Sequence, residues 1–333
     1  MEFEFKEAGF KKYFFCKGMR SIAGQFGKNN RCGIYILHFS NGEYYVGLAV
    51  DVVRRYAQHR VNHSDIEYVS FKEVPKNKLA EVEKETVYKL ENLNKRLRNI
   101  NIVSIIAGDT DFDLIVNKKE QEDWLKNAPT LESVNTERFD YPDLRKKYTK
   151  NFEKLKNNKD YKDIIEILQA YVIECIPFPK KTEYSFWSLS CLPSTGKKVL
   201  FRVNIFWQET FVFYEEDFKD EETGKIDMDY TILIWLSKKI FEEKFSKDEF
   251  EKNFQTLDFV NANHFSGGQD QLCARLSYLE FFDFFDIPEI NFAIKDFNLR
   301  LIRKGGCMWN RNHCFDLADE ALRTDNIEWE ELD

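Results

Sequence analysis

The sequence lacks the cysteine patterns that stabilise small secreted domains or hold zinc. Its 7 cysteines are an odd number, and no two of them are spaced as Cys-X-X-Cys. Disulfide frameworks and standard zinc sites both depend on such patterns. Cys307, His313 and Cys314 lie close together in the chain, but their spacing matches no standard metal motif. We therefore expect free thiols in a reducing compartment.

Long apolar runs are also missing. No stretch reaches the roughly 18 consecutive apolar residues that a membrane-spanning helix needs. Glu2, Glu4, Lys6 and Glu7 interrupt the apolar segment that a secretory signal requires. The chain contains no evident internal repeat or low-complexity tract. These absences predict a cytoplasmic protein that makes no contact with a membrane.

Apolar and aromatic residues are plentiful in spite of these absences. The 333 residues are 43% hydrophobic and include 31 phenylalanines. A chain of this length and composition can bury large cores, and its length favours two domains over one.

Charge is distributed unevenly along the chain. Residues 1–100 contain 18 Lys and Arg against 12 Asp and Glu, whereas residues 101–333 contain 31 against 45. A polyanion is attracted to the first part and repelled by the second, which suits contact between nucleic acid and the N-terminal part. The alternative is that these basic residues form an ordinary solvated surface.

The stretch from Gly33 to Leu90 has the clearest local signals. Two short apolar runs, at 32–37 and 44–48, flank Ser40-Asn41-Gly42-Glu43, and Asn-Gly between β-forming residues predicts a hairpin. The next residues, from Asp51 onward, predict a helix over 52–60 with Asp51 as its N-cap. Arg55 and His59 are four residues apart and share one face of that helix.

A second helix is predicted over 78–97, and Glu83 has an unusual place on it. At about 100° per residue, Leu79, Val87 and Leu90 fall within roughly 60° of Glu83. A carboxylate facing a core is costly unless it is paired or coordinates a cation. Glu83 is thus either bonded to a basic neighbour or a metal ligand. The alternative is a residue at the edge of the stripe that reaches water.

These residues resemble the GIY-YIG nucleases. The resemblance covers residues 30–97, about a fifth of the chain, and Val46 stands where the family name has Ile. A strand at 66–71 that runs into Val74-Pro75 ahead of the second helix also fits the family. The matching positions are Gly33-Ile34-Tyr35, Tyr45-Val46-Gly47, Arg55, His59 and Glu83.

The resemblance implies an α+β domain over 31–100, with a three-stranded antiparallel sheet flanked by helices, that cuts DNA with one Mg²⁺ or Mn²⁺. It implies that Glu83 holds the metal and Arg55 contacts the phosphate. Tyr35, Tyr45 and His59 position and deprotonate the attacking water, with one tyrosine as a candidate general base. Restriction or phage defence, mobile-element biology and repair incision all suit such an enzyme. The competing class is a non-catalytic nucleic-acid-binding or regulatory protein on the same fold.

The nucleic acid is expected to be DNA, with RNA as an alternative. Basic residues flanking the motif are the candidate contacts to its phosphates, namely Lys12, Arg54, Arg60, Lys95 and Arg96. The N-terminal extension, 1–30, interleaves aromatic and basic residues around Phe10 and Lys17. It either clamps a phosphate backbone or forms an extra strand or helix packed on the nuclease core.

The remainder is predicted to form an extension and charged helical linker over 101–163 and a second α+β domain over 164–333. In the former we expect strands at 102–107 and 112–116 and a helix at 118–126. In the latter we expect strands at 184–189, 198–206, 210–214 and 291–302, and helices at 231–245 and 269–285. This domain resembles no family known to us. Its expected role is to select substrate, to bind a partner or to hold the nuclease in check. The expected partner is a regulatory protein or a second copy of this chain.

Overall fold

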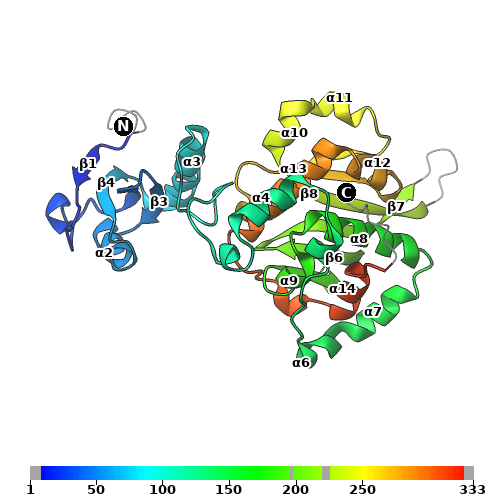
Figure 1. Ribbon diagram of the computed structural model, residues 1–333. Coiled ribbons are helices and arrows are strands. Elements are labelled where there is room, and N and C mark those ends of the chain that lie inside the picture. Colours follow the sequence, from blue (N-terminus) through cyan, green and yellow to red (C-terminus); the bar gives the residue numbers. More distant parts are fainter. Residues whose placement is uncertain (1–8, 196–197, 220–225, 326–333) are drawn as a thin grey trace. The chain divides into compact units, whose positions relative to one another are not determined.

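The computed structural model describes residues 9–195, 198–219 and 226–325. The chain divides into two compact units, Met1–Asp109 and Thr110–Asp333 (Figure 1). Each unit has cores of its own and is described separately. Residues 1–8 of the expected N-terminal extension lie outside the described part of the chain.

Unit 1 is built on a four-stranded antiparallel sheet with the order β1-β4-β2-β3. Its strands are β1 (Lys12–Phe15), β2 (Gly33–Phe39), β3 (Tyr44–Ala49) and β4 (Ile66–Glu73). The predicted three-stranded sheet is wrong by one strand, because the N-terminal aromatic segment pairs with β4, Lys12 opposite Phe71. Residues 12–15 therefore form the extra strand that was one of the two expectations for this segment.

The predicted hairpin is confirmed. β2 pairs with β3 so that Tyr35 lies opposite Gly47, and Gly42 turns the chain with φ 80°. Gly33 allows β4 to come close, since a Cβ there would lie 2.1 Å from the Lys72 carbonyl oxygen. Glycine at this position is thus required by the sheet itself.

Two helices cover the sheet of unit 1. Asp51 caps α2 (Val52–Asn62), accepting the backbone N–H groups of Val53 and Arg54 at 2.9 and 3.1 Å. The other helix, α3 (Leu79–Asn92), ends earlier than predicted, and Asn94 beyond it has φ 54°. The cores on the two faces are separate: Ile34 and Ile36 pack with α3, and Tyr35 and Leu37 pack with α2. The sheet therefore lies between the two helices.

Unit 2 contains a six-stranded antiparallel sheet with the order β5-β6-β7-β8-β10-β9. Its strands are β5 (Trp187–Cys191), β6 (Val199–Ile205), β7 (Gln208–Lys219), β8 (Ile226–Leu236), β9 (Asp258–Val260) and β10 (Leu272–Ser277). Its helices are α4 (Lys118–Lys126), α5 (Leu131–Val134), α6 (Pro142–Arg145), α7 (Thr149–Lys156), α8 (Tyr161–Cys175), α9 (Pro179–Thr182), α10 (Lys238–Lys244), α11 (Lys247–Glu251), α12 (Phe281–Phe285), α13 (Pro288–Ile302) and α14 (Phe315–Ala321). Within the described ranges, no helix has the length and apolar character that crossing a bilayer requires.

Several elements predicted beyond residue 100 are wrong. Residues 291–302, predicted as a strand, belong to helix α13, while the predicted helix 269–285 contains strand β10 before the short α12. Residues 231–245 are the end of β8 followed by α10. The strands expected at 102–107 and 112–116 are absent, since these residues form loops and a short 3₁₀ turn. The helix at 118–126 and the strands at 199–205 and 210–214 lie where they were expected.

The charged segment before residue 163 differs from the expected linker. Its Phe152 and Leu155 are buried in the core of unit 2, together with Phe112 and Trp124. The compact unit begins at Thr110. Residues 110–163 thus carry much of their charge on the outer faces of helices that pack on this core.

Candidate active site

The candidate site is built around β3, the edge strand of the sheet in unit 1. An edge strand presents unpaired N–H and C=O groups that have to be satisfied. The N–H of Leu48 donates to Glu83 Oε1 at 3.1 Å. The Asn99 side chain makes two hydrogen bonds with the backbone of Val46. Its Oδ1 accepts the Val46 N–H at 2.9 Å, and its Nδ2 donates to the Val46 carbonyl oxygen at 2.7 Å. The Leu48 N–H at the edge of β3 thereby helps to fix the position of the Glu83 carboxylate.

Glu83 points inward as its helical phase predicts. It is half-buried, whereas Glu81 and Glu85 on the same helix are exposed. Burial raises the pKa of Glu83 above its usual range, against the opposing effects of the Leu48 hydrogen bond and the Arg55 charge. Among the described residues, no donor contacts Oε2. The Oε2 atom of Glu83 is thus available to a ligand.

Tyr35 and His59 form a hydrogen-bonded pair, with 2.8 Å between the Tyr35 hydroxyl and His59 Nε2. Burial, with help from Arg55 and His63, lowers the pKa of His59 to about 4, so the imidazole is neutral at pH 7. In the tautomer protonated at Nδ1, Nε2 accepts the proton of the Tyr35 hydroxyl. Burial also raises the pKa of Tyr35. The resting pair is therefore a neutral phenol bonded to a neutral imidazole.

Tyr45 and Gly47 complete this side of the site. The Tyr45 ring lies 4.7 Å from His59 and 6.3 Å from Tyr35, measured between ring centroids. Burial raises the pKa of Tyr45, while the Arg55 charge opposes the shift. A Cβ at Gly47 would lie 2.3 Å from the Tyr35 hydroxyl oxygen. The absence of a side chain at Gly47 therefore leaves room for the Tyr35 side chain to pass over β3 and reach His59.

The exposed Arg55 guanidinium interacts with Tyr35, Tyr45 and Glu83. Interaction with the Tyr35 hydroxyl, and then with Tyr45, raises the pKa of Arg55, and the same charge acts on Glu83. Its Nη1 donates to Gln58 Oε1 at 3.1 Å. The structure thus brings together the five residues that were predicted to be catalytic: Tyr35, Tyr45, Arg55, His59 and Glu83.

The five predicted phosphate contacts are not brought together. Lys12 lies on β1, at the opposite edge of the sheet from β3, and the side chains of Lys12 and Arg60 donate to backbone carbonyl oxygens at 2.5 and 2.8 Å. Arg96 pairs with a buried glutamate at 2.9 Å, and Lys95 is half-buried. Arg54 is exposed on α2 next to Arg55 and makes no ion pair with the described residues. Of the five, Arg54 is best placed to contact a ligand at the site.

Two further histidines, His63 and His313, lie outside the predicted catalytic set. His63 stacks on His59 with 6.1 Å between ring centroids, so it lies beside the site. In unit 2, His313 Nδ1 accepts the Leu189 N–H and Nε2 contacts Glu183 Oε1 at 2.9 Å. Both ring nitrogens of His313 are thus engaged by the protein.

Sequence reasoning missed Asn99, because a lone asparagine after a basic turn carries no signal for its distant partner. Asn99 is 6% exposed and fills both hydrogen-bonding groups of Val46. Asn99→Ala leaves those backbone groups without partners and is expected to destabilise unit 1 by about 1–3 kcal/mol. Urea denaturation measures the effect. Asn101→Ala is the control, since the Asn101 side chain makes no hydrogen bond within the described residues. Equal stability of the two variants contradicts this role for Asn99.

The donor set suits one hydrated divalent cation better than a cage of protein ligands. Within the described residues, no group of three or more His, Cys, Asp or Glu side chains is placed to hold a metal ion. Magnesium keeps most of its waters and is commonly held by one or two carboxylates together with substrate phosphates. Glu83, with one carboxylate oxygen free, fits that mode of binding.

Comparison of the whole chain with models of known protein families, with curated proteins and with solved structures finds no match.

Proposed function

We propose that unit 1 is the catalytic domain of a metal-dependent endonuclease that hydrolyses phosphodiester bonds in DNA. The observation that carries the proposal is the convergence of Tyr35, Tyr45, Arg55, His59 and Glu83 at the edge of β3. The similarity of the same positions to the GIY-YIG motif supports it, as does the excess of basic residues in 1–100. The site offers a carboxylate, a guanidinium and a neutral phenol–imidazole pair, which are the groups that phosphodiester hydrolysis needs.

In this proposal the side chains act on the phosphate and on the attacking water. The Arg55 guanidinium binds two phosphate oxygens with its planar fork. Water gives a proton to the Tyr35 hydroxyl oxygen as Tyr35 passes its own proton to His59 Nε2. The resulting hydroxide attacks phosphorus, and the bond to the leaving oxygen breaks. Glu83 would hold a Mg²⁺ or Mn²⁺ ion, which would supply positive charge for the phosphate oxygens and the leaving alkoxide.

The proton relay through His59 refines the idea of a tyrosine base. A phenolate at Tyr35 or Tyr45 is not favoured, because burial raises the pKa of both hydroxyls. The neutral His59, 2.8 Å from the Tyr35 hydroxyl, takes the proton without a free phenolate having to form. The general base is then the pair and not a single tyrosine.

The pH dependence of cleavage follows from the two pKa shifts. Activity needs Glu83 ionised and His59 neutral. The pKa of Glu83 is raised above 4.5, whereas that of His59 is lowered to about 4. As pH falls, Glu83 is therefore protonated before His59. We expect kcat/KM at subsaturating Mn²⁺ to fall on the acid side with its midpoint above 4.5, the ordinary carboxyl value. A midpoint at or below 4.5 contradicts the assignment of this acid limb to Glu83.

Incubation of the purified full chain with supercoiled plasmid, single-stranded DNA and RNA, each with and without Mn²⁺, tests the proposed activity. Nicked or linear plasmid that forms only with Mn²⁺ is the expected result. A Glu83→Gln preparation purified in parallel controls for contaminating nucleases. Failure to cut any of the three substrates, or equal cutting by both preparations, overturns the proposal. Cutting of RNA alone would mean that the substrate is RNA and not DNA, while the catalytic role of the site would stand.

A further inference from the structure

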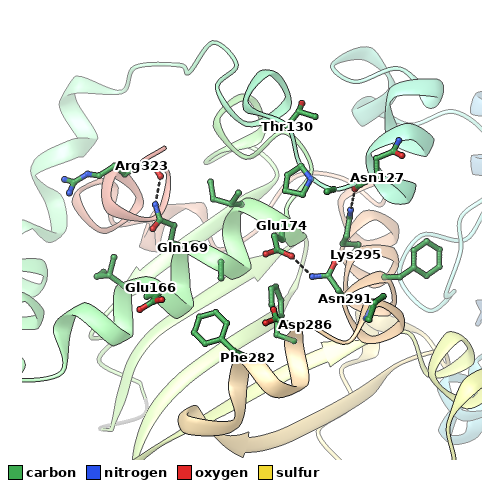
Figure 2. A pocket seen from close by; sticks show the side chains of 18 of the residues that line it. Asn127, Thr130, Glu166, Gln169, Glu174, Phe282, Asp286, Asn291, Lys295 and Arg323 are labelled. Atoms are coloured by element: carbon green, nitrogen blue, oxygen red, sulfur yellow. Dashed lines mark hydrogen bonds between the residues drawn. The ribbon is translucent and has the colours of Figure 1, made fainter. Parts of the chain in front are cut away.

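A cavity of about 1210 Å³ opens beside helix α8 in unit 2 (Figure 2). One wall is the face of α8 from Tyr161 to Glu174. The other walls come from α12, from α13, from the end of α14 and from the loop that follows α4. All the lining residues belong to unit 2, so this cavity is separate from the site at β3.

The cavity is lined by four acidic and four basic side chains, and most of these charges are solvated or paired. Those exposed to water are Lys126, Lys162, Glu166, Asp286 and Arg323. Glu320 pairs with Arg323 at 2.9 Å. Glu174 and Lys295 remain: Glu174 is half-buried and Lys295 is 4% exposed. The cavity thus presents one shielded charge of each sign.

The Lys295 ammonium is incompletely satisfied by the protein. It donates to the Asn127 carbonyl oxygen at 2.7 Å and lies 4.8 Å from the centroid of the Trp124 ring. Within the described residues it forms no salt bridge and contacts no second acceptor, although an ammonium has three N–H donors. A buried charge is costly unless it is paired and hydrogen-bonded. Lys295 therefore favours an anionic group in the cavity.

Glu174 carries the opposite charge on the neighbouring helix α8. Asn291, one turn before Lys295 on α13, donates to Glu174 Oε2 at 2.7 Å (Figure 2). No donor among the described residues contacts Oε1. Burial raises the pKa of Glu174, and the Lys295 charge opposes the shift, yet the two groups form no salt bridge. They are therefore near enough to act on each other but too far apart to be direct partners.

Apolar side chains line the same cavity. Phe282 on α12 and Phe292 on α13 are 36% and 37% exposed. Ile173, next to Glu174 on α8, is buried. Exposed apolar side chains gathered in a concave site are typical of ligand-binding grooves. The volume of the cavity leaves room for a bulky apolar group in addition to the atoms that contact Glu174 and Lys295.

We propose that this cavity binds a free α-amino acid with a large apolar side chain. The carboxylate of the ligand accepts from Lys295, and its ammonium donates to Glu174 Oε1, so that the ligand bridges the two helices. Its side chain contacts Phe282 and Phe292. A ligand that carries only positive charge is repelled by Lys295, and one that carries only negative charge is repelled by Glu174. A zwitterion meets both groups with opposite charge.

Isothermal titration of L-leucine, L-phenylalanine and L-tryptophan into the full chain tests the proposal. Saturable binding of at least one of them, at one site for each chain, is expected. The analogues of that amino acid without the ammonium and without the carboxylate should each bind at least about tenfold more weakly. For phenylalanine these analogues are 3-phenylpropanoate and 2-phenylethylamine. No saturable binding of any of the three amino acids, or an analogue that binds as tightly as the amino acid, overturns the proposal.

Two variants assign the two charges of the ligand. Glu174→Gln should weaken binding of the amino acid about tenfold without weakening that of the analogue that lacks an ammonium. The glutamine keeps an acceptor for Asn291. Lys295→Met should weaken binding of the amino acid without weakening that of the analogue that lacks a carboxylate. Should Lys295→Met fail to fold, the comparison of the analogues on the wild type still decides the outcome.

Glu166→Gln is the matched control, since it removes an exposed negative charge from the same helix and the same cavity. Its affinity for the amino acid should stay within about twofold of the wild type, because water already solvates the Glu166 charge. Equal losses of affinity in Glu174→Gln and Glu166→Gln overturn the proposal, since they indicate only a general effect of charge.

Discussion

Glu83→Gln is expected to lower the rate of DNA cleavage by about 10³-fold or more, because it removes the carboxylate proposed to hold the metal ion. The same variant should be more stable than the wild type at pH 7. Glutamine keeps an oxygen that can accept the Leu48 N–H, the contact made at 3.1 Å by Glu83 Oε1. It carries no charge into the half-buried position.

The sign of the stability change follows from the raised pKa of Glu83. Because the folded protein holds this proton more tightly than the unfolded chain, the group favours folding at low pH. That contribution is lost as pH rises through the folded pKa. The gain in the free energy of unfolding on Glu83→Gln should thus be present at pH 7, shrink as pH falls through the folded pKa and vanish below 4.5, the ordinary carboxyl value that applies to the unfolded chain. Urea denaturation at several pH values measures it.

Glu85→Gln is the matched control for both effects, since Glu85 is exposed on the same helix. It should retain full activity and wild-type stability. Loss of activity in Glu85→Gln equal to that in Glu83→Gln, or destabilisation by Glu83→Gln at pH 7, contradicts the proposed role of Glu83.

Arg55→Ala has the second largest expected effect, a loss of about 10²–10³-fold in kcat. The guanidinium is the cation that acts on Tyr35, Tyr45 and Glu83 together, and it is exposed to an incoming phosphate. Arg55→Lys should recover only part of the loss, because an ammonium cannot bind two phosphate oxygens as the planar fork does. Single-turnover cleavage at saturating Mn²⁺ measures the effect.

The Arg54→Ala variant distinguishes an effect on the chemical step from an effect on DNA binding. Arg54 is also exposed on α2, and removing it takes away the same charge. Arg54→Ala should raise KM and reduce the salt dependence of DNA binding, as loss of one phosphate contact does, while kcat is unchanged. If Arg54→Ala lowers kcat as much as Arg55→Ala does, the effect is one of general charge and the specific role of Arg55 is wrong.

Local sequence signals predicted several elements of unit 1 correctly. Asn41-Gly42 indicated the hairpin and Asp51 the start of α2, and both are confirmed. The helical phase of α3 showed that Glu83, and not Glu81 or Glu85, faces inward. These features depend on residues within a few positions of one another, so the sequence alone contains them.

Features formed by distant residues could not be predicted in the same way. The strand β1 pairs Lys12 with Phe71, and Asn99 binds Val46 from 53 positions away. The need for glycine at 47 becomes visible only when the Tyr35 hydroxyl is seen beside it. No local pattern reports any of these three contacts.

Unit 2 shows how buried segments mislead. The strand β10 is buried along most of its length, and a short apolar run of this kind cannot be told from a helix by periodicity. The reverse error occurred at 291–302, where Ile290, Ile294 and Phe297 are buried at helical spacing. Pro288 at the first turn marks this helix start, a signal that outweighs the apparent alternation.

Direct measurement of Mn²⁺ binding tests the central claim that Glu83 holds one divalent cation at the edge of β3. Electron paramagnetic resonance can count free and bound Mn²⁺ in the presence of an uncleavable phosphorothioate duplex, for the wild type and for Glu83→Gln. The account predicts one ion for each wild-type chain and loss of that ion in the variant. An ion retained by Glu83→Gln, or no bound ion in the wild type, would contradict it.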